Sequence, residues 1–425
     1  MAVIFLNRYF YPDHSATSQL LSDLAFALAA QAHDVHVVAS RQLYDDPAQR
    51  LDAHDVVEGV TIHRVWTTRF GRSNLAGRAI DYLTFYLSAA VTLLWLCRRG
   101  DIVVAMTDPP MMSVLAGPIA ALRGARLVTW LQDIFPETAE ATGLGSNSAG
   151  GMAYAALRWL RNRSLGQAAM NVALGDVMAE RVERFGVVRS RIRVIPNWSD
   201  GDVVYPLDPA MNALRAEWSL SDAFVVAYSG NLGRVHEYDT FLDAIAALEQ
   251  QDATRLVPAT AEPPGSPEAR RIVWLFVGGG ALYKPFEDEV KRRGLRSVQF
   301  RPYQPRERLA ESLSAGDVHL ISLRPEFEGL VVPSKYYGIL AAGRPTLFVG
   351  AADGEIARNL ALNRTGLSVA MGDGAALAKA VVELSRQPDR VREMGVTARA
   401  VFERDFTRET SIARWSALLQ VIRTD

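Results

Sequence analysis

The sequence predicts an α/β fold of two Rossmann-like, doubly wound domains that face each other across a cleft. Short apolar runs, typical of buried parallel strands, alternate with longer stretches of helical periodicity along nearly the whole chain. This alternation stops once, in the polar and turn-rich segment 203–221, and then restarts. Because 425 residues suffice for two domains, we predict one domain over residues 1–203 and a second over residues 204–407.

The first half contains the pattern of a parallel sheet with helical connections. Apolar runs predict strands at residues 3–6, 35–39, 61–66, 102–105, 126–131, 171–173 and 193–195. Periodic apolar positions between them predict helices over 15–31, 79–97, 111–123, 149–167 and 175–185. In such sheets ligands bind beyond the carboxyl ends of the strands, so the loops after these strands are the first places to search for a site.

The second half repeats the pattern. Strands are predicted at 224–229, 272–277, 298–300, 318–322 and 346–349, and helices at 238–249, 284–294, 306–315, 374–386, 389–399 and 408–422. We expect the C-terminal helix, residues 408–425, to pack back on the first domain. Segment 252–270 is rich in Pro, Ala and Gly, and we interpret it as a surface insertion without assigned structure.

Composition narrows the class of protein. A formal net charge of -1 gives no general attraction to nucleic acid, and we expect no nucleic-acid partner. A single cysteine, Cys97, excludes an internal disulfide framework and suits a reducing compartment. The first predicted strand follows the N-terminus without a secretory signal pattern, so we expect a cytoplasmic protein. The histidines lack metal-site spacing and no suitable Asp-x-Asp is present, so we expect no obligatory metal and no other cofactor.

Helix 79–97 is unusually apolar and lies among arginines. Six arginines stand against one acid, Asp81, between residues 64 and 99, and residues 82–97 carry no charge. That uncharged stretch is shorter than the roughly 20 residues of a spanning helix. Three interpretations stay open: a buried helix of the domain, a helix that enters a membrane interface with its arginines against anionic head groups, or a true span.

The segment 323–345 combines an acidic loop with a candidate anion site. Glu326 and Glu328 follow a predicted strand, and Pro333-Ser334-Lys335 has the pattern of a helix start with Ser334 as its cap. Free backbone N–H groups, the helix dipole and the adjacent lysine favour a phosphate group. We predict that this segment binds the sugar and the diphosphate of a nucleotide sugar.

Two glycine loops follow neighbouring strands of the same half. The first contains Gly230, Gly233 and Arg234, and the second is the run 278–280. Glycine permits a close backbone approach, and an arginine supplies a fork of donors for phosphate oxygens. Each loop alone is a common structural turn, but three anion-compatible loops at strand ends of one sheet favour a binding site.

The chain resembles the retaining glycosyltransferases of family 4, which have two Rossmann-like domains in the GT-B arrangement. The similarity covers nearly the whole length and is strongest to bacterial enzymes that build exopolysaccharides, O-antigens or colanic-acid-like polymers. It rests on ordered motifs, which read FYPDHSATSQL (10–20), WLQDIFPE (130–137), VIPNWSD (194–200), YSGNLGRVHEYDTFLDA (228–244), WLFVGGG (274–280) and PEFEGLVVPSKYYGILAAGRP (325–345).

The resemblance assigns the second half to the nucleotide-sugar donor. The family places an Arg and a Lys on the donor diphosphate where this sequence has Asn231 and His236, so Arg234 is the expected substitute cation. The resemblance implies diphosphate binding by Ser334 and Lys335. Further donor contacts are implied for Gly230, Gly233, Gly278, Tyr303, Phe327, Glu328, Gly329 and Leu330.

The two acidic positions of the family motif are only half present. Glu326 fits the first, which contacts the donor sugar, and we count it among the catalytic candidates. The second acid, which binds ribose in the family, corresponds by spacing to Ser334 or Gly338, and neither residue is acidic. The sequence therefore lacks an evident carboxylate for the ribose.

In the first half the resemblance points to the acceptor. The loop Ser15, Ala16 and Thr17 matches a small-residue loop on the acceptor side, and Ser15 is expected to cap the following helix. His14 is a catalytic candidate, with an ordinary loop histidine as the alternative. Asp133, after strand 126–131, is the best candidate for an acid/base or acceptor-orienting group, with a helix-capping role as the alternative.

These expectations give a retaining glycosyltransferase that moves a sugar from a nucleoside-diphosphate sugar, with UDP favoured over GDP, to a hydroxyl group. The implied acceptor is linked to polyprenyl diphosphate, and the enzyme would lie on the inner face of the cytoplasmic membrane through helix 79–97. Two alternatives stay open: a sugar-nucleotide epimerase, and a non-catalytic protein that binds a sugar nucleotide or lipid.

Overall fold

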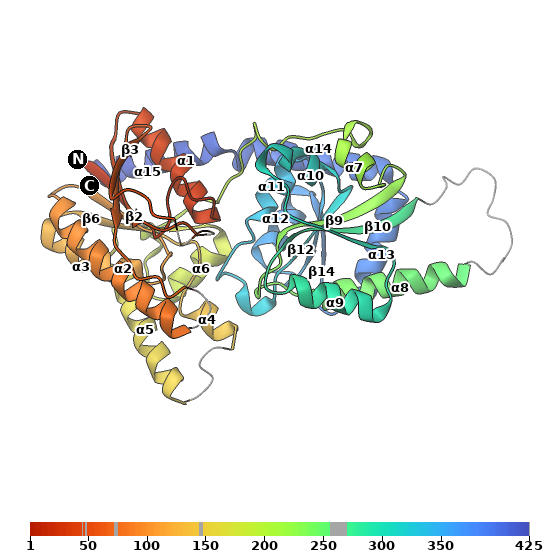
Figure 1. Cartoon of the computed structure of the whole chain (residues 1–425), viewed down its shortest axis with the longest axis horizontal. Coiled ribbons are helices and arrows are strands. Elements are labelled where there is room, and N and C mark those ends of the chain that lie inside the picture. Colours follow the sequence, from red (N-terminus) through yellow and green to blue (C-terminus); the bar gives the residue numbers. More distant parts are fainter. Residues whose placement is uncertain (45, 47–48, 72–74, 144–147, 256–269, 425) are drawn as a thin grey trace. The chain divides into compact units, whose positions relative to one another are not determined.

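The computed structural model describes residues 1–44, 46, 49–71, 75–143, 148–255 and 270–424 (Figure 1). The chain forms two compact units. The first comprises Met1–Asn197, Gly329–Val332 and Glu409–Asp425, and the second comprises Trp198–Glu328 and Pro333–Arg408. The chain thus leaves the first unit at Trp198, returns to it briefly at Gly329–Val332 and returns finally after Arg408.

The first unit is built on one largely parallel sheet. Its strands are β1 (Ala2–Leu6), β2 (Asp34–Ser40), β3 (His54–Val57), β4 (Val60–Val65), β5 (Ile102–Ala105), β6 (Arg126–Trp130), β7 (Met170–Ala173) and β8 (Ile192–Val194). They lie in the order β3-β4-β2-β1-β5-β6-β7-β8, and only β3 runs antiparallel to its neighbour. Strands β1, β5 and β7 are buried throughout, which explains their continuous apolar sequences.

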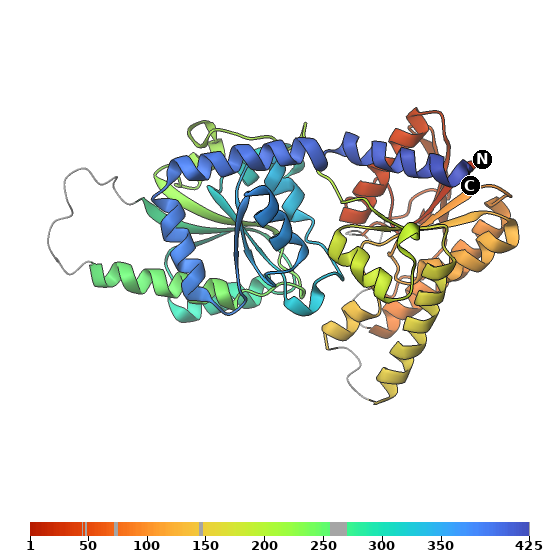
Figure 2. The same ribbon diagram turned by 180° about the vertical axis from the view of Figure 1, so that it is seen from behind.

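The helices of the first unit connect and cover this sheet. They are α1 (Ala16–Ala30), α2 (Leu75–Leu96), α3 (Met112–Arg123), α4 (Glu137–Ala141), α5 (Ser148–Gln167), α6 (Asp176–Arg184) and most of α15 (Arg408–Thr424), with a short 3-10 turn at Arg189–Arg191. The C-terminal helix α15 lies beside α1 (Figure 2), and the Ser416 hydroxyl donates to the Gln31 side chain at 2.9 Å. Trp415 packs on Trp130 with ring centroids 4.8 Å apart.

The second unit has a fully parallel sheet of six strands. These are β9 (Ala223–Asn231), β10 (Arg271–Gly279), β11 (Val298–Arg301), β12 (Val318–Ser322), β13 (Thr346–Val349) and β14 (Gly366–Val369), in the order β11-β10-β9-β12-β13-β14. Aromatic side chains from both strands and helices fill its core, among them Phe224, Tyr228, Trp274, Phe276 and Phe286. The two sheets confirm the predicted fold class of two Rossmann-like domains.

The helices of the second unit are α7 (Ala213–Glu217), α8 (Asp239–Arg255), α9 (Tyr283–Arg293), α10 (Leu309–Ser314), α11 (Lys335–Ala341), α12 (Glu355–Asn363), α13 (Gly374–Ser385) and α14 (Pro388–Asp405). Short 3-10 turns occur at Pro209–Met211, Arg306–Arg308 and Pro325–Phe327. The expectation of an unstructured insertion from residue 252 is wrong for its first part, because α8 continues to Arg255. Residues 256–269 lie outside the described residues.

Helix α2 packs along one narrow face only. Every fourth residue is buried, namely Asp81, Phe85, Ala89 and Leu93. The segment Ala76–Leu96 is long and apolar enough to span a membrane, but only 22% of its most apolar window is buried. The buried side packs into the core of the first unit through Phe85, Ala89 and Leu93, and the opposite side is exposed.

Candidate active site

Two glycine turns form the edge of the second sheet where β9 and β10 end. Gly230 and Gly278 have φ of +117° and +137°, a region that side chains rarely adopt. A Cβ at Gly278 would lie 2.3 Å from the Gly230 carbonyl oxygen, and one at Gly280 would lie 2.2 Å from Oδ1 of Asn231. Only glycine therefore allows these loops to approach each other so closely, and backbone groups line the strand ends in place of side chains.

Lys335, the first residue of α11, reaches this glycine edge. Its ammonium nitrogen donates to the Tyr228 hydroxyl and lies 3.3 Å from the Asn231 carbonyl oxygen and 3.1 Å from Nε2 of His236. The same nitrogen is 4.2 Å from the centroid of the Tyr228 ring, an additional cation–π contact. Burial among these groups lowers the pKa of Lys335 to about 7.

His236 is buried behind Lys335 and is neutral. Burial and the nearby Lys335 charge lower the pKa of its imidazole to about 3. Its Nδ1 contacts the Ser322 carbonyl oxygen, which can only accept a hydrogen bond. The proton of the neutral ring is therefore on Nδ1, and Nε2 accepts a hydrogen bond from Lys335. His236 stands where the family has a cation, but here its imidazole accepts a hydrogen bond from the Lys335 ammonium.

Arg234, Asn231 and Ser334 lie around the same edge and are exposed. The backbone of Ser334 is already helical, with φ of -61° and ψ of -24°, and its side chain forms no capping hydrogen bond. A side-chain cap requires extended backbone at that residue. The expectation that Ser334 caps α11 is therefore wrong, although its position at the start of the helix agrees with the sequence.

The two acids of the 326–328 loop have different environments. Glu326 is exposed and forms an ion pair with Arg324. Glu328 is buried and accepts the backbone N–H of Glu355, at the start of α12, at 3.3 Å. Desolvation raises the pKa of Glu328 to about 7. A Cβ on Gly354 would lie 2.2 Å from Oε1 of Glu328, so this glycine makes room for the buried carboxylate.

Tyr303 and Phe327 complete the predicted donor residues on this unit. Tyr303 follows β11 and is 58% exposed, with its ring over Gly279, where an added Cβ would lie 3.1 Å from the ring. An exposed aromatic ring at a strand end is a suitable surface for stacking of a nucleobase. Phe327 is fully buried, so it supports the loop from within the core.

Gly329 and Leu330 group with a different unit from the other predicted donor residues. They belong to the segment Gly329–Val332, which groups with the first unit. There the Leu330 carbonyl accepts the backbone N–H of Ile134 at 2.9 Å. Gly338, where the family's second acid was sought, lies within α11, and its absent Cβ would meet Leu313 at 3.4 Å.

Asp133 lies beyond the end of β6 in the first unit. Burial raises the pKa of its carboxyl group, against a hydrogen bond from Thr107 and the charge of Arg78, which lower it. Within the described residues its Oδ1 has no hydrogen-bond partner. A cavity of about 20 Å³, lined by Thr107, Ser113, Thr129 and Asp133 among others, could hold one water molecule. The geometry suits a group that receives or orients a proton.

The loop before α1 is organised by Asp13, which the sequence did not single out. The buried Asp13 carboxylate accepts the Ser15 N–H at 2.8 Å, the Ser15 hydroxyl and the Tyr44 N–H. Ser15 therefore forms no side-chain cap on α1, and that expectation is wrong. His14 and Ala16 are exposed and Thr17 is partly buried, so the loop presents His14 to solvent.

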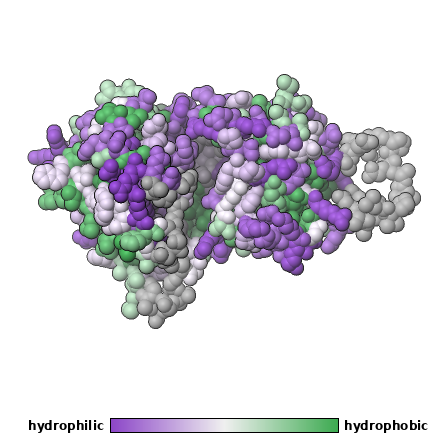
Figure 3. Space-filling view, in the orientation of Figure 1, coloured by the Kyte–Doolittle hydropathy of each residue, from purple (hydrophilic) through white to green (hydrophobic). Residues whose placement is uncertain are grey.

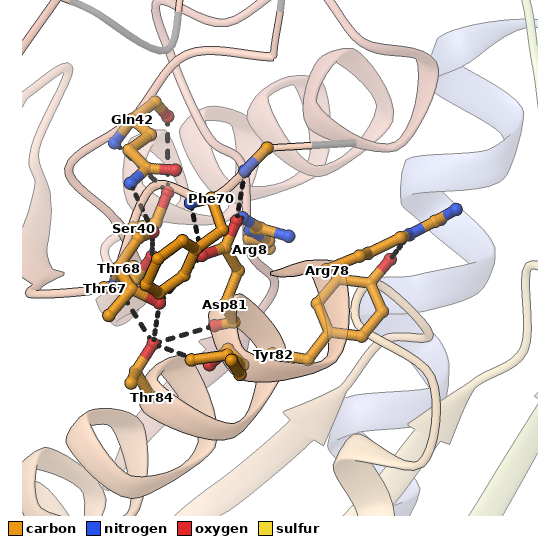
Figure 4. Close-up of polar contacts among 12 residues, drawn as sticks. Arg8, Ser40, Gln42, Thr67, Thr68, Phe70, Arg78, Asp81, Tyr82 and Thr84 are labelled. Carbon is orange, nitrogen blue, oxygen red and sulfur yellow. Dashed lines mark hydrogen bonds and ion pairs between the residues drawn. The ribbon is translucent and has the colours of Figure 1, made fainter. Parts of the chain in front are cut away.

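A second acid, Asp81, fixes the start of α2 (Figure 4). Its buried carboxylate accepts the N–H groups of Phe70 and Gly71 at 3.0 Å each and the Thr68 hydroxyl at 2.7 Å. Arg8, directly after β1, lies 3.8 Å away as its ion partner. The position of Asp81 as the only acid among arginines was the sequence signal for this network. Arg78 donates to the Tyr82 hydroxyl at 2.9 Å.

The two sets of residues permit different chemistry. The second unit places one ammonium and an exposed arginine at glycine-lined strand ends, which suits a phosphate-bearing ligand. The first unit places a carboxyl group of raised pKa and an exposed histidine on strand-end loops. No group of three or more His, Cys, Asp or Glu side chains able to hold a metal occurs among the described residues.

Comparisons with known proteins agree with this arrangement. The family model described as "Glycosyl transferase 4-like domain" matches residues 17–198. The probable glycosyltransferase WbjE of Pseudomonas aeruginosa is 27% identical over 369 residues, with 84% of each chain covered. The putative colanic acid biosynthesis glycosyl transferase WcaI of Escherichia coli K12 is 23% identical over 365 residues, covering 84% of this chain and 85% of its own.

The fold is shared with solved structures of the same architecture. The Anabaena protein Alr3699/HepE, crystallised with UDP and glucose, superposes with a TM-score of 0.69 at 16% sequence identity. The alignment covers 99% of this chain and 100% of that protein. The fold, the family model and the two relatives agree with the motifs on which the resemblance rests. The family model over residues 17–198, the two relatives and the shared fold support a glycosyltransferase of the family 4 type with the GT-B fold.

Proposed function

We propose that this glycosyltransferase moves a sugar from a nucleoside-diphosphate sugar, with UDP favoured, to a hydroxyl of a lipid-linked glycan, with retention. The observation that carries the proposal is the Lys335 ammonium at the glycine-lined ends of β9 and β10, where a diphosphate can approach the backbone. The Anabaena structural relative has been crystallised with UDP and with UDP-glucose, which supports a UDP-sugar donor. The name of WcaI supports a role in polysaccharide synthesis.

In this proposal the second unit stabilises the leaving group. Negative charge develops on the diphosphate as the sugar–oxygen bond breaks, and preorganised cations stabilise that charge. Lys335 and the exposed Arg234 supply the cations, and Ser334 lies at the adjoining helix start. Glu326, exposed beside Arg324, is the candidate for contact with the donor sugar. No metal takes part in this scheme.

The first unit would hold the acceptor. The acceptor hydroxyl must lose its proton during transfer, and a carboxyl group with raised pKa is suited to receive it. Asp133 meets that requirement through its burial and its unpaired Oδ1. His14, with Ser15, Ala16 and Thr17 beside it, is exposed and would contact the acceptor side of the site.

We assign the membrane contact to the outer face of α2, defined by Ile80, Leu83, Leu87, Val91, Leu94 and Trp95. All six side chains are exposed, and Trp95 is 83% exposed. Hydrophobic residues also reach the surface of the first unit in Figure 3. Arg98 and Arg99, both exposed, follow the end of the helix, and Arg123 donates to the Cys97 carbonyl there at 2.9 Å. An exposed apolar stripe flanked by arginines fits an anionic lipid interface.

Not every arginine around α2 can serve this interface. Arg64 is buried and pairs with Asp55 at 3.2 Å, and Arg72 lies outside the described residues. Arg69 and Arg78 are exposed at the opposite end of the helix from Arg98. A polyprenyl-diphosphate acceptor would lie at the same membrane surface, on the cytoplasmic side where nucleotide sugars are available.

The test is donor turnover. The purified protein is incubated with UDP- and GDP-sugars and a bacterial membrane extract, and release of UDP or GDP is measured. We expect extract-dependent release with at least one UDP-sugar. Binding of UDP without release from any donor would favour the alternative of a non-catalytic binding protein. Formation of an epimerised sugar nucleotide or free 2-epimer would favour an epimerase.

A further inference from the structure

The groups that contact the ammonium of Lys335 among the described residues carry no negative charge. Tyr228 and Asn231 face it from β9, and His236 faces it from the loop before α8. Tyr303, which follows β11, is a further titratable neighbour of Tyr228. Tyrosine is neutral at physiological pH, and burial raises the pKa of Tyr228 further. A partly buried cation held only by neutral groups is electrostatically incomplete until an anion arrives.

Each neighbour of Lys335 restricts where the ammonium can lie. The Nδ1–H of His236 is used by the Ser322 carbonyl, so its only free lone pair, on Nε2, is directed at Lys335. The Tyr228 hydroxyl can donate to the Asn231 carbonyl, 3.1 Å away, and accept from Lys335 at the same time. Two neutral acceptors and one carbonyl thus hold the nitrogen at the glycine edge, and Cε lies 3.7 Å from a Cβ placed on Gly230.

We infer that His236 and Tyr228 are positioning residues that hold the Lys335 ammonium as the principal cation for the diphosphate of the bound nucleotide, and that diphosphate binding is accompanied by uptake of a proton. This inference rests on the proposed donor. His236 acts through Lys335 and does not bind phosphate, because its remaining ring nitrogen is an acceptor. The principal cation of this site thus comes from the start of α11, and the end of β9 and the loop after it supply the groups that position this cation.

The proton balance is simple. In the free protein the ammonium of Lys335 loses its proton as the pH rises through its pKa of about 7. A diphosphate beside it favours the charged form and raises that pKa, so a complex formed above pH 7 takes one proton from solvent. Affinity for the diphosphate is therefore complete below pH 7 and decreases as the pH rises towards the pKa of the complex.

The experiment is isothermal titration calorimetry with UDP from pH 7 to pH 9, in two buffers of different ionisation enthalpy. We expect uptake of close to one proton at pH 8.5 and a UDP dissociation constant that rises about tenfold per pH unit above pH 7.5. Uridine, which lacks the diphosphate, should bind weakly and without proton uptake. UDP binding without a pH slope and without proton uptake would overturn the inference.

Variants separate positioning from mere structural support. Lys335→Arg should bind UDP with a flattened pH slope, because its guanidinium does not titrate in this range. Lys335→Ala should weaken binding by about 10- to 100-fold at pH 7. His236→Gln can donate to Ser322 and accept from Lys335, so it should keep the pH dependence of UDP binding. His236→Ala should weaken UDP binding and alter its pH dependence. Equal pH slopes in the wild-type protein and in Lys335→Arg would refute the inference.

A double variant that moves the positive charge from residue 335 to residue 236 gives an independent check. His236→Lys combined with Lys335→Ala returns one ammonium to the same contact from the opposite residue. We expect this double variant to bind UDP more tightly than Lys335→Ala alone, and the reverse order would contradict the positioning role. Since only UDP binding is measured, these results are distinct from failure of sugar transfer, which would affect the proposed function alone.

Discussion

At the scale of single residues, the molecule depends on a few positions where size and charge allow no substitute. Gly278 and Gly280 permit two loops to meet at the strand ends, and Gly354 makes room for the Glu328 carboxylate. Lys335 provides a cation without an acidic partner among the groups that contact it. These residues set the backbone shape and the charge at the strand ends of the second unit.

The glycine at 278 should be irreplaceable. In Gly278→Ala the new Cβ would overlap the Gly230 carbonyl oxygen. The alanine would also have to adopt a φ near +137°. We expect a loss of about 1–3 kcal/mol in the free energy of unfolding of the second unit and a marked loss of UDP affinity, measured by urea unfolding and calorimetry.

Gly294→Ala is the matched control for that substitution. Gly294 also has positive φ, +68°, at the end of α9, but an added Cβ meets no atom within 4 Å. This variant should cost about 1 kcal/mol from backbone strain alone and leave UDP binding unchanged. Equal losses of UDP affinity in both variants would contradict a specific role for the glycine edge.

Several residue roles could be predicted from the sequence, and others could not. The motif positions of Lys335, Gly230 and Gly278 led to the strand ends where they lie. The capping roles of Ser15 and Ser334 were wrong, because Asp13 binds the Ser15 hydroxyl and the Ser334 backbone is helical. Such outcomes depend on competing hydrogen-bond partners that spacing does not reveal.

At the scale of elements, α2 and α15 use their apolar residues differently. Helix α15 buries Ile412, Trp415, Leu418, Leu419 and Ile422, as its periodicity predicted. Helix α2 is apolar on almost all sides, so periodicity could not show which side packs. The structure buries the side that contains Asp81, whose carboxylate is bound by the preceding loop, and leaves the opposite side exposed.

Membrane binding should depend on the outer face of α2. Leu87→Glu with Val91→Glu places two charges on exposed apolar positions, and we expect at least a fivefold loss of binding to vesicles that contain anionic lipid, measured by flotation. The free energy of unfolding should change little, since both side chains are more than half exposed in the wild-type protein.

Leu362→Glu is the control for that experiment. Leu362 is an 82% exposed leucine on α12 in the second unit, which the proposal does not assign to the membrane contact. It should bind vesicles like the wild-type protein. If all three forms bind equally, or if none prefers anionic vesicles to neutral ones, the outer face of α2 is not the membrane contact.

The packing of α15 predicts a clear stability effect. Trp415 is fully buried against Trp130, so Trp415→Ala should lower the free energy of unfolding of the first unit by about 3–5 kcal/mol, measured by urea denaturation. Val421→Ala on the same helix, where the side chain is 47% exposed, should cost less than about 1 kcal/mol. Similar costs for both would indicate that α15 does not contribute to the core.

Helices α4, α7 and α12 and the strands β3 and β14 were not predicted from the sequence. Edge strand β3 reads HDVV and is exposed or only partly buried, so it lacks the alternation of a half-buried strand. Strand β14 contains Gly366, a residue disfavoured in strands, yet here a Cβ would lie 2.0 Å from the Thr346 carbonyl oxygen. Both strands are defined by their neighbours, through hydrogen bonding to β4 and β13.

At the scale of the whole molecule, the chain forms two largely parallel sheets, to which the proposed function gives separate roles. The fold class followed from the alternating pattern, because buried parallel strands and their helices have distinct periodicities. The return of the chain to the first unit through α15 was expected from the sequence, whereas the grouping of Gly329–Val332 with that unit required the structure. The choice of donor and acceptor is determined by side chains of the loops at the strand ends.

Transfer of a labelled sugar from the donor to a lipid acceptor is the activity expected of this protein and can be measured directly. UDP-sugars carrying ¹⁴C in the sugar are incubated with the protein and a bacterial lipid extract, and the label entering the organic phase is compared with the UDP released. The account predicts transfer from at least one donor in a one-to-one ratio with UDP, and at least a tenfold loss of transfer at subsaturating donor in Lys335→Ala. Transfer that is unchanged in Lys335→Ala, or the absence of transfer from every donor, would contradict it.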